Sequence, residues 1–204
     1  MKIPSREECY RIMIGMSMPD HIVAHSFQVC RVAVLLTKSR AAVNGSLHLG
    51  LVEASALLHD ITKSRSFQTG EDHASTGEAY LKELGYPAVA EIIGQHVLLN
   101  TYFASDAVTE AEIVNYADKR VVHDRIVPLD ERIAYLLERY GTEEQWRRQI
   151  LINAEKSREM ESRIFFGLPF TPPEIEQRIP HDDRHQVFSS IRKFAAGSGG
   201  RSAD

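Results

Sequence analysis

The sequence places a histidine directly before an aspartate at the end of an apolar segment. Residues 51–58 are mostly apolar, and His59 and Asp60 follow them. Burying an unpaired imidazole beside a carboxylate costs several kcal/mol, which is comparable with the whole stability margin of a domain. A divalent metal ion would compensate for that cost, and a simple hydrogen-bonded pair at a helix end is the alternative. The pair therefore indicates a metal site if further ligands accompany it.

Four more ionisable residues have apolar or small neighbours at helical spacing: His25, His73, His96 and Asp118. Each one taken alone is more simply interpreted as a structural core residue. A helical domain has one core, however, so inward-facing ionisable groups from separate helices must meet or stay unpaired. Imidazole and carboxylate ligands together suit iron, manganese, cobalt, nickel or zinc. The six residues therefore predict a buried site for one or two divalent transition metal ions.

The order of these residues resembles the signature of the HD-domain superfamily of metal-dependent phosphohydrolases. The resemblance covers roughly residues 20–125, from His25 through His59-Asp60 to Asp118. Ile61-Thr62-Lys63 after Asp60 is similar to the His-Asp-Ile-Gly-Lys form of bacterial members, with Thr62 in place of glycine. The resemblance implies that the four signature residues bind one metal ion. It further implies that His73 and His96 hold a second ion in two-metal members, with Asp60 bridging.

Gly85-Tyr86-Pro87 spells the tripeptide of the HD-GYP cyclic dinucleotide phosphodiesterases. It lies between the two additional histidines, where it ends one predicted helix and begins the next. The longer motif that surrounds the tripeptide in that family is absent, so we do not infer that substrate.

Several residues near the expected ligands could bind a phosphorylated substrate. Lys63 follows Asp60, and Lys119 and Arg120 follow Asp118 directly, so all three could offset phosphate charge. Solvated cations at helix ends are the simpler alternative. His21 lies one turn before His25 and is either a substrate contact or a surface residue. We take Asp60 and Lys63 as the candidate catalytic residues.

These residues predict hydrolysis of a phosphate ester or anhydride of a small nucleotide-like molecule by metal-activated water. Two other classes of function stay open. A di-iron oxygenase could use the same helical scaffold and would need oxygen. A non-catalytic nucleotide sensor or adaptor would bind without turnover, although such members usually lack some ligands and here all six are present.

Helical periodicity and capping signals predict an all-α protein, a single-domain HD-type bundle with extra C-terminal helices. We expect a core at about 18–125, a helical extension at 126–196 and a disordered tail at 197–204, so that residues 1–196 form one domain. A polar loop is expected over 62–72. Helices are expected at about 5–16, 18–43, 48–60, 73–84, 87–98, 109–124, 128–140, 142–166 and 184–195.

Composition sets the outer limits on function. The 204 residues carry a formal net charge of −4, so no general positive field favours extended nucleic acid or an anionic membrane. No segment approaches the length of a membrane span, and no signal peptide is evident. The two cysteines have no metal-binding spacing and suggest a reducing compartment. We therefore expect a cytoplasmic protein, and its oligomeric state is not indicated.

Overall fold

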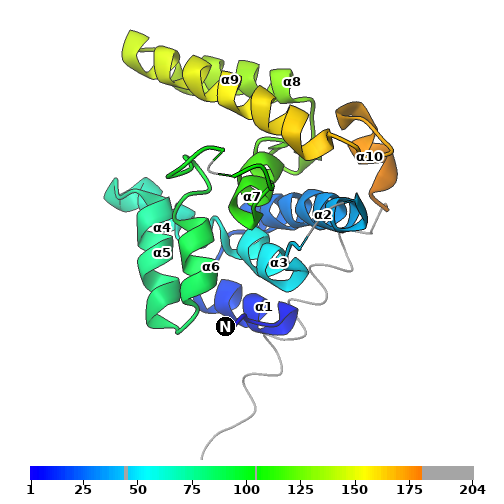
Figure 1. The fold of residues 1–204 in the computed structure, drawn as a ribbon. Coiled ribbons are helices and arrows are strands. Elements are labelled where there is room, and N and C mark those ends of the chain that lie inside the picture. The colour runs from blue at the N-terminus through cyan, green and yellow to red at the C-terminus, as the bar shows by residue number, and fades with distance from the viewer. Residues whose placement is uncertain (44–45, 104, 181–204) are drawn as a thin grey trace, which may run out of the picture.

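The computed structural model describes residues 1–43, 46–103 and 105–180 and confirms an all-α fold. Within these residues the only strands are two short ones, which form an antiparallel hairpin pairing Val121 with Ile126. The elements, shown in Figure 1, are α1 (Arg6–Gly15), α2 (Asp20–Val43), α3 (Leu49–Leu58), α4 (Lys63–Thr69), α5 (His73–Glu83), α6 (Pro87–Ile93), α7 (Glu110–Asp118), β1 (Val121–Val122), β2 (Arg125–Ile126), α8 (Leu129–Tyr140), α9 (Glu144–Phe165), the 3-10 turn η1 (Pro172–Glu174) and α10 (Ile175–Arg178).

Helix α3 lies at the centre of the bundle. It contacts α1, α2, α6 and α7, so most of its side chains are enclosed by other helices. Val52, Ala56, Leu57 and Leu58 have no exposed surface. A helix surrounded in this way is apolar on every face rather than amphipathic, which explains why residues 51–58 lack a polar stripe.

Capping residues fix the beginnings of two helices as the sequence predicts. Ser5 and Glu8 form a reciprocal capping box at α1, and Thr109 and Glu112 form one at α7. Each box satisfies backbone N–H groups that have no partner within the helix. The helix carrying Asp118 therefore begins where its sequence indicates.

The prediction of a loop over 62–72 is wrong, because α4 occupies most of this segment. This short helix buries no residue, so no apolar periodicity marks it in the sequence. Gly70 ends it in the left-handed conformation with φ of 73°, which glycine adopts without steric cost. Gly70 is the signal by which the sequence could have revealed α4.

Two helices end earlier than expected. Helix α6 ends at Ile93 rather than near residue 98, so His96 lies in a turn beyond it. Helix α7 ends at Asp118, and the β1–β2 hairpin takes the place of its expected last turn. The hairpin turns through His123, whose φ is 55°.

Helices α8 and α9 form an antiparallel hairpin that crosses one end of the bundle and extends beyond it (Figure 1). Leu129, Ile133 and Ala154 form a small separate core between them. Helix α9 also packs on α7.

No helix in the described ranges has the length and apolarity needed to cross a membrane. The helix expected at 184–195 and the tail expected at 197–204 lie outside the described residues, and the domain limits stay predictions.

Candidate metal centre

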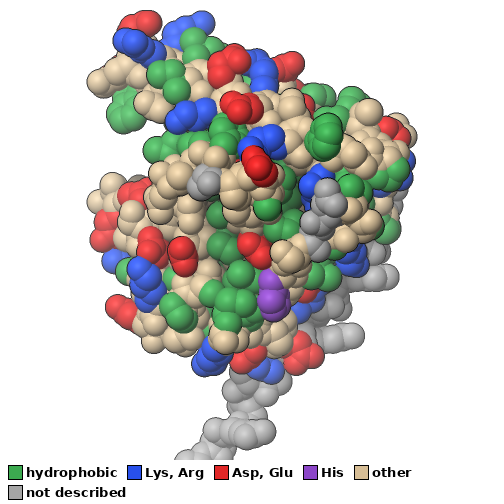
Figure 2. Space-filling view, in the orientation of Figure 1, with side chains coloured by type: hydrophobic (Ala, Val, Ile, Leu, Met, Phe, Trp, Pro, Cys, Tyr) green, Lys and Arg blue, Asp and Glu red, His purple; other side chains and the backbone are tan. Residues whose placement is uncertain are grey.

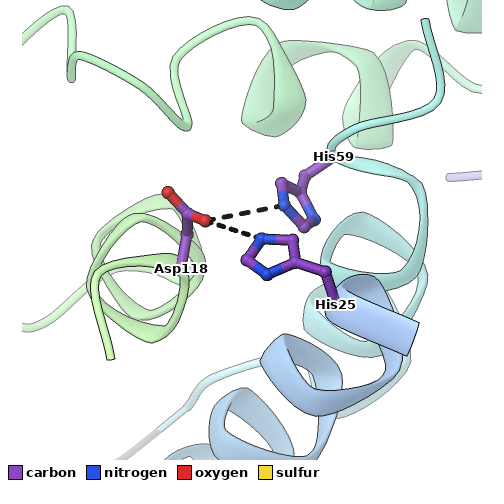
Figure 3. Close-up of side chains that lie close together, drawn as sticks. All are labelled: His25, His59 and Asp118. Atoms are coloured by element: carbon purple, nitrogen blue, oxygen red, sulfur yellow. Dashed lines mark hydrogen bonds and ion pairs between the residues drawn. The ribbon is translucent and has the colours of Figure 1, made fainter. Parts of the chain in front are cut away.

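Three side chains from three different helices converge at one buried point (Figure 3). His25 lies on the inner face of α2, His59 caps the C-terminal end of α3, and Asp118 is the last residue of α7. The Nε2 atoms of His25 and His59 lie 3.0 and 3.7 Å from Oδ1 of Asp118. All three residues are buried.

Asp60 joins this group to a second pair of histidines. Its Oδ2 lies 3.4 Å from Nε2 of His59 and 3.8 Å from Nε2 of His25. Its Oδ1 faces the other way, 3.3 Å from Nε2 of His73 and 3.5 Å from Nε2 of His96. Asp60 is 1% exposed and lies between the two groups, so the structure brings all six predicted ligands together.

Backbone carbonyl groups orient three of the four imidazoles. The Nδ1 atom of His25 is 2.7 Å from the carbonyl oxygen of His123. The Nδ1 atoms of His59 and His96 lie 2.8 and 2.6 Å from the carbonyl oxygens of the residues three positions before them. Because a carbonyl oxygen only accepts, these Nδ1 atoms carry the hydrogen. In the neutral rings each Nε2 then presents its lone pair to the cluster, the arrangement typical of metal-binding histidine.

Electron pairs consequently face one another at short range. Nε2 of His25 lies 3.0 Å from a carboxylate oxygen of Asp118, and Nε2 of His96 lies 3.5 Å from Oδ1 of Asp60. Among the described residues, Nε2 of His59 and Oδ1 of Asp60 are buried without a hydrogen-bond partner. Leaving such atoms unpaired is costly, and a cation between them removes that cost. The donor set therefore fits a metal ion bound by nitrogen and oxygen.

Both carboxyl groups of the cluster stay ionised. Burial by itself raises the pKa of Asp60 and of Asp118, but the surrounding groups hold both pKa values well below the usual range. For Asp60 these groups are the imidazoles of His59, His73 and His96, and for Asp118 they are chiefly His25 and Arg132. An imidazole lowers these pKa values only when it donates from Nε2, and a bound metal ion would take the place of that proton. The site therefore offers anionic oxygen ligands at neutral pH.

Lys63 is the candidate cation that reaches the cluster. Its Nζ donates a hydrogen bond of 2.6 Å to Oδ2 of Asp60. Burial lowers the pKa of Lys63, but the charges of Asp60 and Asp118 outweigh this effect and raise the pKa above its ordinary value. The ammonium group is therefore positive at neutral pH, at the first turn of α4.

Lys119 is buried beside the cluster, but oxygen atoms of the protein surround its Nζ. Burial lowers its pKa to about 8. Its four acceptors lie 2.9 to 3.4 Å away and are the carbonyl oxygens of His96, Val97 and Asn115 and the side-chain oxygen of Asn115. Lys119 thus holds the turn that carries His96 in place. Its ammonium group makes these contacts with the protein itself, without a substrate.

Two further substrate candidates lie apart from the cluster. Arg120 is 2% exposed and donates to groups of the protein itself: the carbonyl oxygens of Val127 and Pro172 and the hydroxyl of Tyr116. Its guanidinium therefore fastens α7 to the chain that follows, which is a structural role in place of the phosphate contact considered above. His21 is exposed on α2 and does not line the cavity beside the cluster.

A cavity of about 410 Å³ adjoins the cluster and extends beneath the α8–α9 hairpin. His73, His96 and Asp118 lie in its wall together with Lys63. Arg132 of α8 also lines it, and the sequence reasoning missed this residue. Arg132 follows Leu129 by three positions and precedes Leu136 by four, so a cation on the apolar stripe of an amphipathic helix was the available signal.

Comparison with models of protein families gives a match to the HD domain. A model of the HD domain family matches residues 22–121, a range that contains the six clustered residues and excludes α8 and α9. No curated protein and no solved structure matches the chain significantly.

Proposed function

Residues 22–121 form an HD domain, and from this premise we propose that the protein is a metal-dependent phosphohydrolase. Its substrate is a small nucleotide-like phosphate ester or anhydride. The observation that carries the proposal is the convergence of buried nitrogen and oxygen atoms, two of them without hydrogen-bond partners among the described residues, at the end of a cavity. Such a cavity with convergent polar groups is the usual form of an active site.

In this proposal the six residues hold one or two divalent transition metal ions. His25, His59, Asp60 and Asp118 form the first position, and His73 and His96 form the second with Asp60 shared between them. Asp60 suits the bridging role because its two oxygen atoms face different histidines. Bound there, a divalent ion acts as a Lewis acid toward phosphoryl oxygen and lowers the pKa of water.

Lys63 supplies the remaining charge that the reaction needs. Its Nζ stays protonated beside Asp60 and lines the cavity. A phosphate oxygen at the cluster can therefore accept a charge-assisted hydrogen bond from Lys63, which offsets the negative charge that develops during hydrolysis. Asp60 both orients Lys63 and presents ligand atoms, so we assign these two residues to catalysis.

The net charge of the chain agrees with a small anionic substrate. A net charge of −4 gives no extended attraction for nucleic acid, so anion binding is local to the cavity. Cys9 and Cys30 are both buried and free, as expected in a reducing compartment. We therefore propose a cytoplasmic enzyme.

Phosphate release tests the proposal. The purified chain, reconstituted with each of Fe, Mn, Co, Ni and Zn, should release phosphate from at least one member of a panel of nucleotides. Asp118→Asn should abolish release, because the amide loses the charge that a metal ion requires. Asp106→Asn is the matched control, since Asp106 is exposed in a loop. Nucleotide binding without phosphate release under all metals would favour a sensor, and oxygen-dependent oxidation of a substrate would favour an oxygenase.

A further inference from the structure

The α8–α9 hairpin completes the cavity from outside the HD domain. Leu129, Ile133 and Leu136 of α8 and Ile150 and Ala154 of α9 form an apolar wall facing the metal centre. Figure 2 shows the surface hollowed beneath the free end of this hairpin. The HD family match ends at residue 121, so this wall is a feature of the chain beyond the shared domain.

Arg132 projects from this wall toward the metal centre. One of its terminal nitrogen atoms lies 3.8 Å from Oδ1 of Asp118, beyond hydrogen-bond distance. Its side chain is 13% exposed, and among the described residues its Nε is buried without a hydrogen-bond partner. The guanidinium also packs against the ring of Tyr135, at 5.6 Å from the centroid. A mostly buried, oriented cation with donors still available is suited to an anion that enters the cavity.

The other residues that line the cavity indicate which kind of organic group is attached to the anion. Besides the metal centre, the charged side chains of the cavity are Lys63, Lys119 and Arg132, which lie beside Asp60, His96 and Asp118 respectively. Between Leu129 and Ser157 the remaining lining groups are apolar or uncharged, including the amide of Asn153. An uncharged organic group can pack there, with the amide able to hydrogen-bond to it. A volume of about 410 Å³ lies within the usual range for small-molecule sites.

We propose that Arg132 binds the substrate phosphate together with Lys63, and that the α8–α9 wall selects a phosphate ester whose organic part is uncharged and of nucleoside size. This inference rests on the proposed phosphohydrolase function and adds a specificity element to it. Arg132 meets the phosphate through its planar guanidinium, and Leu136 meets the organic group.

Binding measurements on the metal-loaded protein test both parts, with inorganic phosphate and adenosine 5′-monophosphate as probes. Arg132→Ala should weaken the binding of both probes about 10- to 100-fold, the loss expected for a hydrogen bond to a charged group. Leu136→Ala should weaken the nucleotide by about 10-fold through lost apolar contact and leave inorganic phosphate unchanged. Arg148→Ala and Leu151→Ala are matched controls on exposed positions of α9 and should bind both probes as the wild type does.

Metal content and circular dichroism are measured for every variant. If Arg132→Ala does not fold, Arg132→Lys replaces it, and it should weaken phosphate binding because lysine lacks the planar pair of donors. Wild-type phosphate affinity in a folded, metal-loaded Arg132 variant would overturn the proposal, as would failure of the wild type to bind either probe. Unchanged nucleotide affinity in Leu136→Ala would overturn the role of the wall. Binding of both probes as expected, with no phosphate released from any nucleotide, would leave this site intact and refute the hydrolase function.

Discussion

At the residue scale, the metal centre depends on which nitrogen atom of each imidazole carries hydrogen. Carbonyl oxygens accept from Nδ1 of His25, His59 and His96, so the Nε2 lone pairs point inward. Helical spacing and the resemblance to HD domains were sufficient to predict the six clustered residues. The carbonyl partner of His25 was not predictable, because it is 98 positions away and depends on a hairpin turn.

Lys63→Ala provides a test at this scale. The change removes the donor to Asp60 and the proposed phosphate contact, so kcat/KM should fall by about 10- to 100-fold, equivalent to about 1.5–3 kcal/mol. A fall in kcat would indicate that the contact is made chiefly in the transition state. Arg65→Ala on the exposed side of α4 is the control for steady-state kinetics. Wild-type kcat/KM in folded Lys63→Ala protein would remove Lys63 from the site.

Two arginines show that closeness to a ligand in the sequence does not predict closeness to it in the structure. Arg120 follows a ligand directly but is turned toward Val127 and Pro172. Arg132 is 14 positions beyond Asp118 and still lies 3.8 Å from it. Neighbours on a helix point about 100° apart, so adjacency to Asp118 does not place a side chain in the site. Only the packing of α8 over the cluster determines which arginine lines the cavity.

At the element scale, the positions of the helix ends determine the geometry of the metal centre. The caps of α1 and α7 and the limits of α8 followed from the sequence because each has a local signal. The early ends of α6 and α7 were not predicted, although Gly94 directly after α6 was an available stop signal. They arise from tertiary contacts, such as the donation by the amide of Asn115 to the carbonyl oxygen of His96. The β1–β2 hairpin is too short to show strand alternation in the sequence.

The turn of this hairpin can be tested at His123. Its carbonyl oxygen accepts from His25, whereas its side chain is exposed and its φ is 55°. His123→Gly keeps the carbonyl and relieves a backbone conformation that costs roughly 1 kcal/mol for a residue with a side chain. Metal content should stay at the wild-type value, and the melting temperature should stay the same or rise. Loss of metal in this variant would mean that the His123 side chain, rather than its carbonyl, supports the site.

At the scale of the whole molecule, one main core joins the helices from α1 to α10 other than α4 and α8, and the metal centre lies against it. Cys9 on α1 and Cys30 on α2 belong to this core and are 0% and 2% exposed. Burial raises the pKa of each thiol to about 12. An all-α bundle with a buried site was predictable from periodicity and composition, whereas the way α8 and α9 cross its end was not.

Thiol labelling reports on this core. Because reaction requires the exposed thiolate, neither cysteine should react with a thiol reagent in the native protein at pH 8, and both should react in denaturant. Labelling is followed by absorbance and mass spectrometry. Divalent metal should slow labelling under mildly denaturing conditions, since an ion that binds only the folded state stabilises it. Rapid labelling of either cysteine in the native protein would contradict the packing of α1 on α2 and α3.

Metal stoichiometry tests the central claim most directly. Elemental analysis of the protein after reconstitution and removal of loosely bound ions should give about two equivalents of a divalent transition metal per chain, as expected for two positions sharing one carboxylate. The double variant His73→Ala, His96→Ala should retain about one equivalent, because His25, His59, Asp60 and Asp118 remain. One equivalent in the wild type under metal excess would contradict the bridged pair. No bound metal in the folded wild-type protein would contradict the metal centre itself.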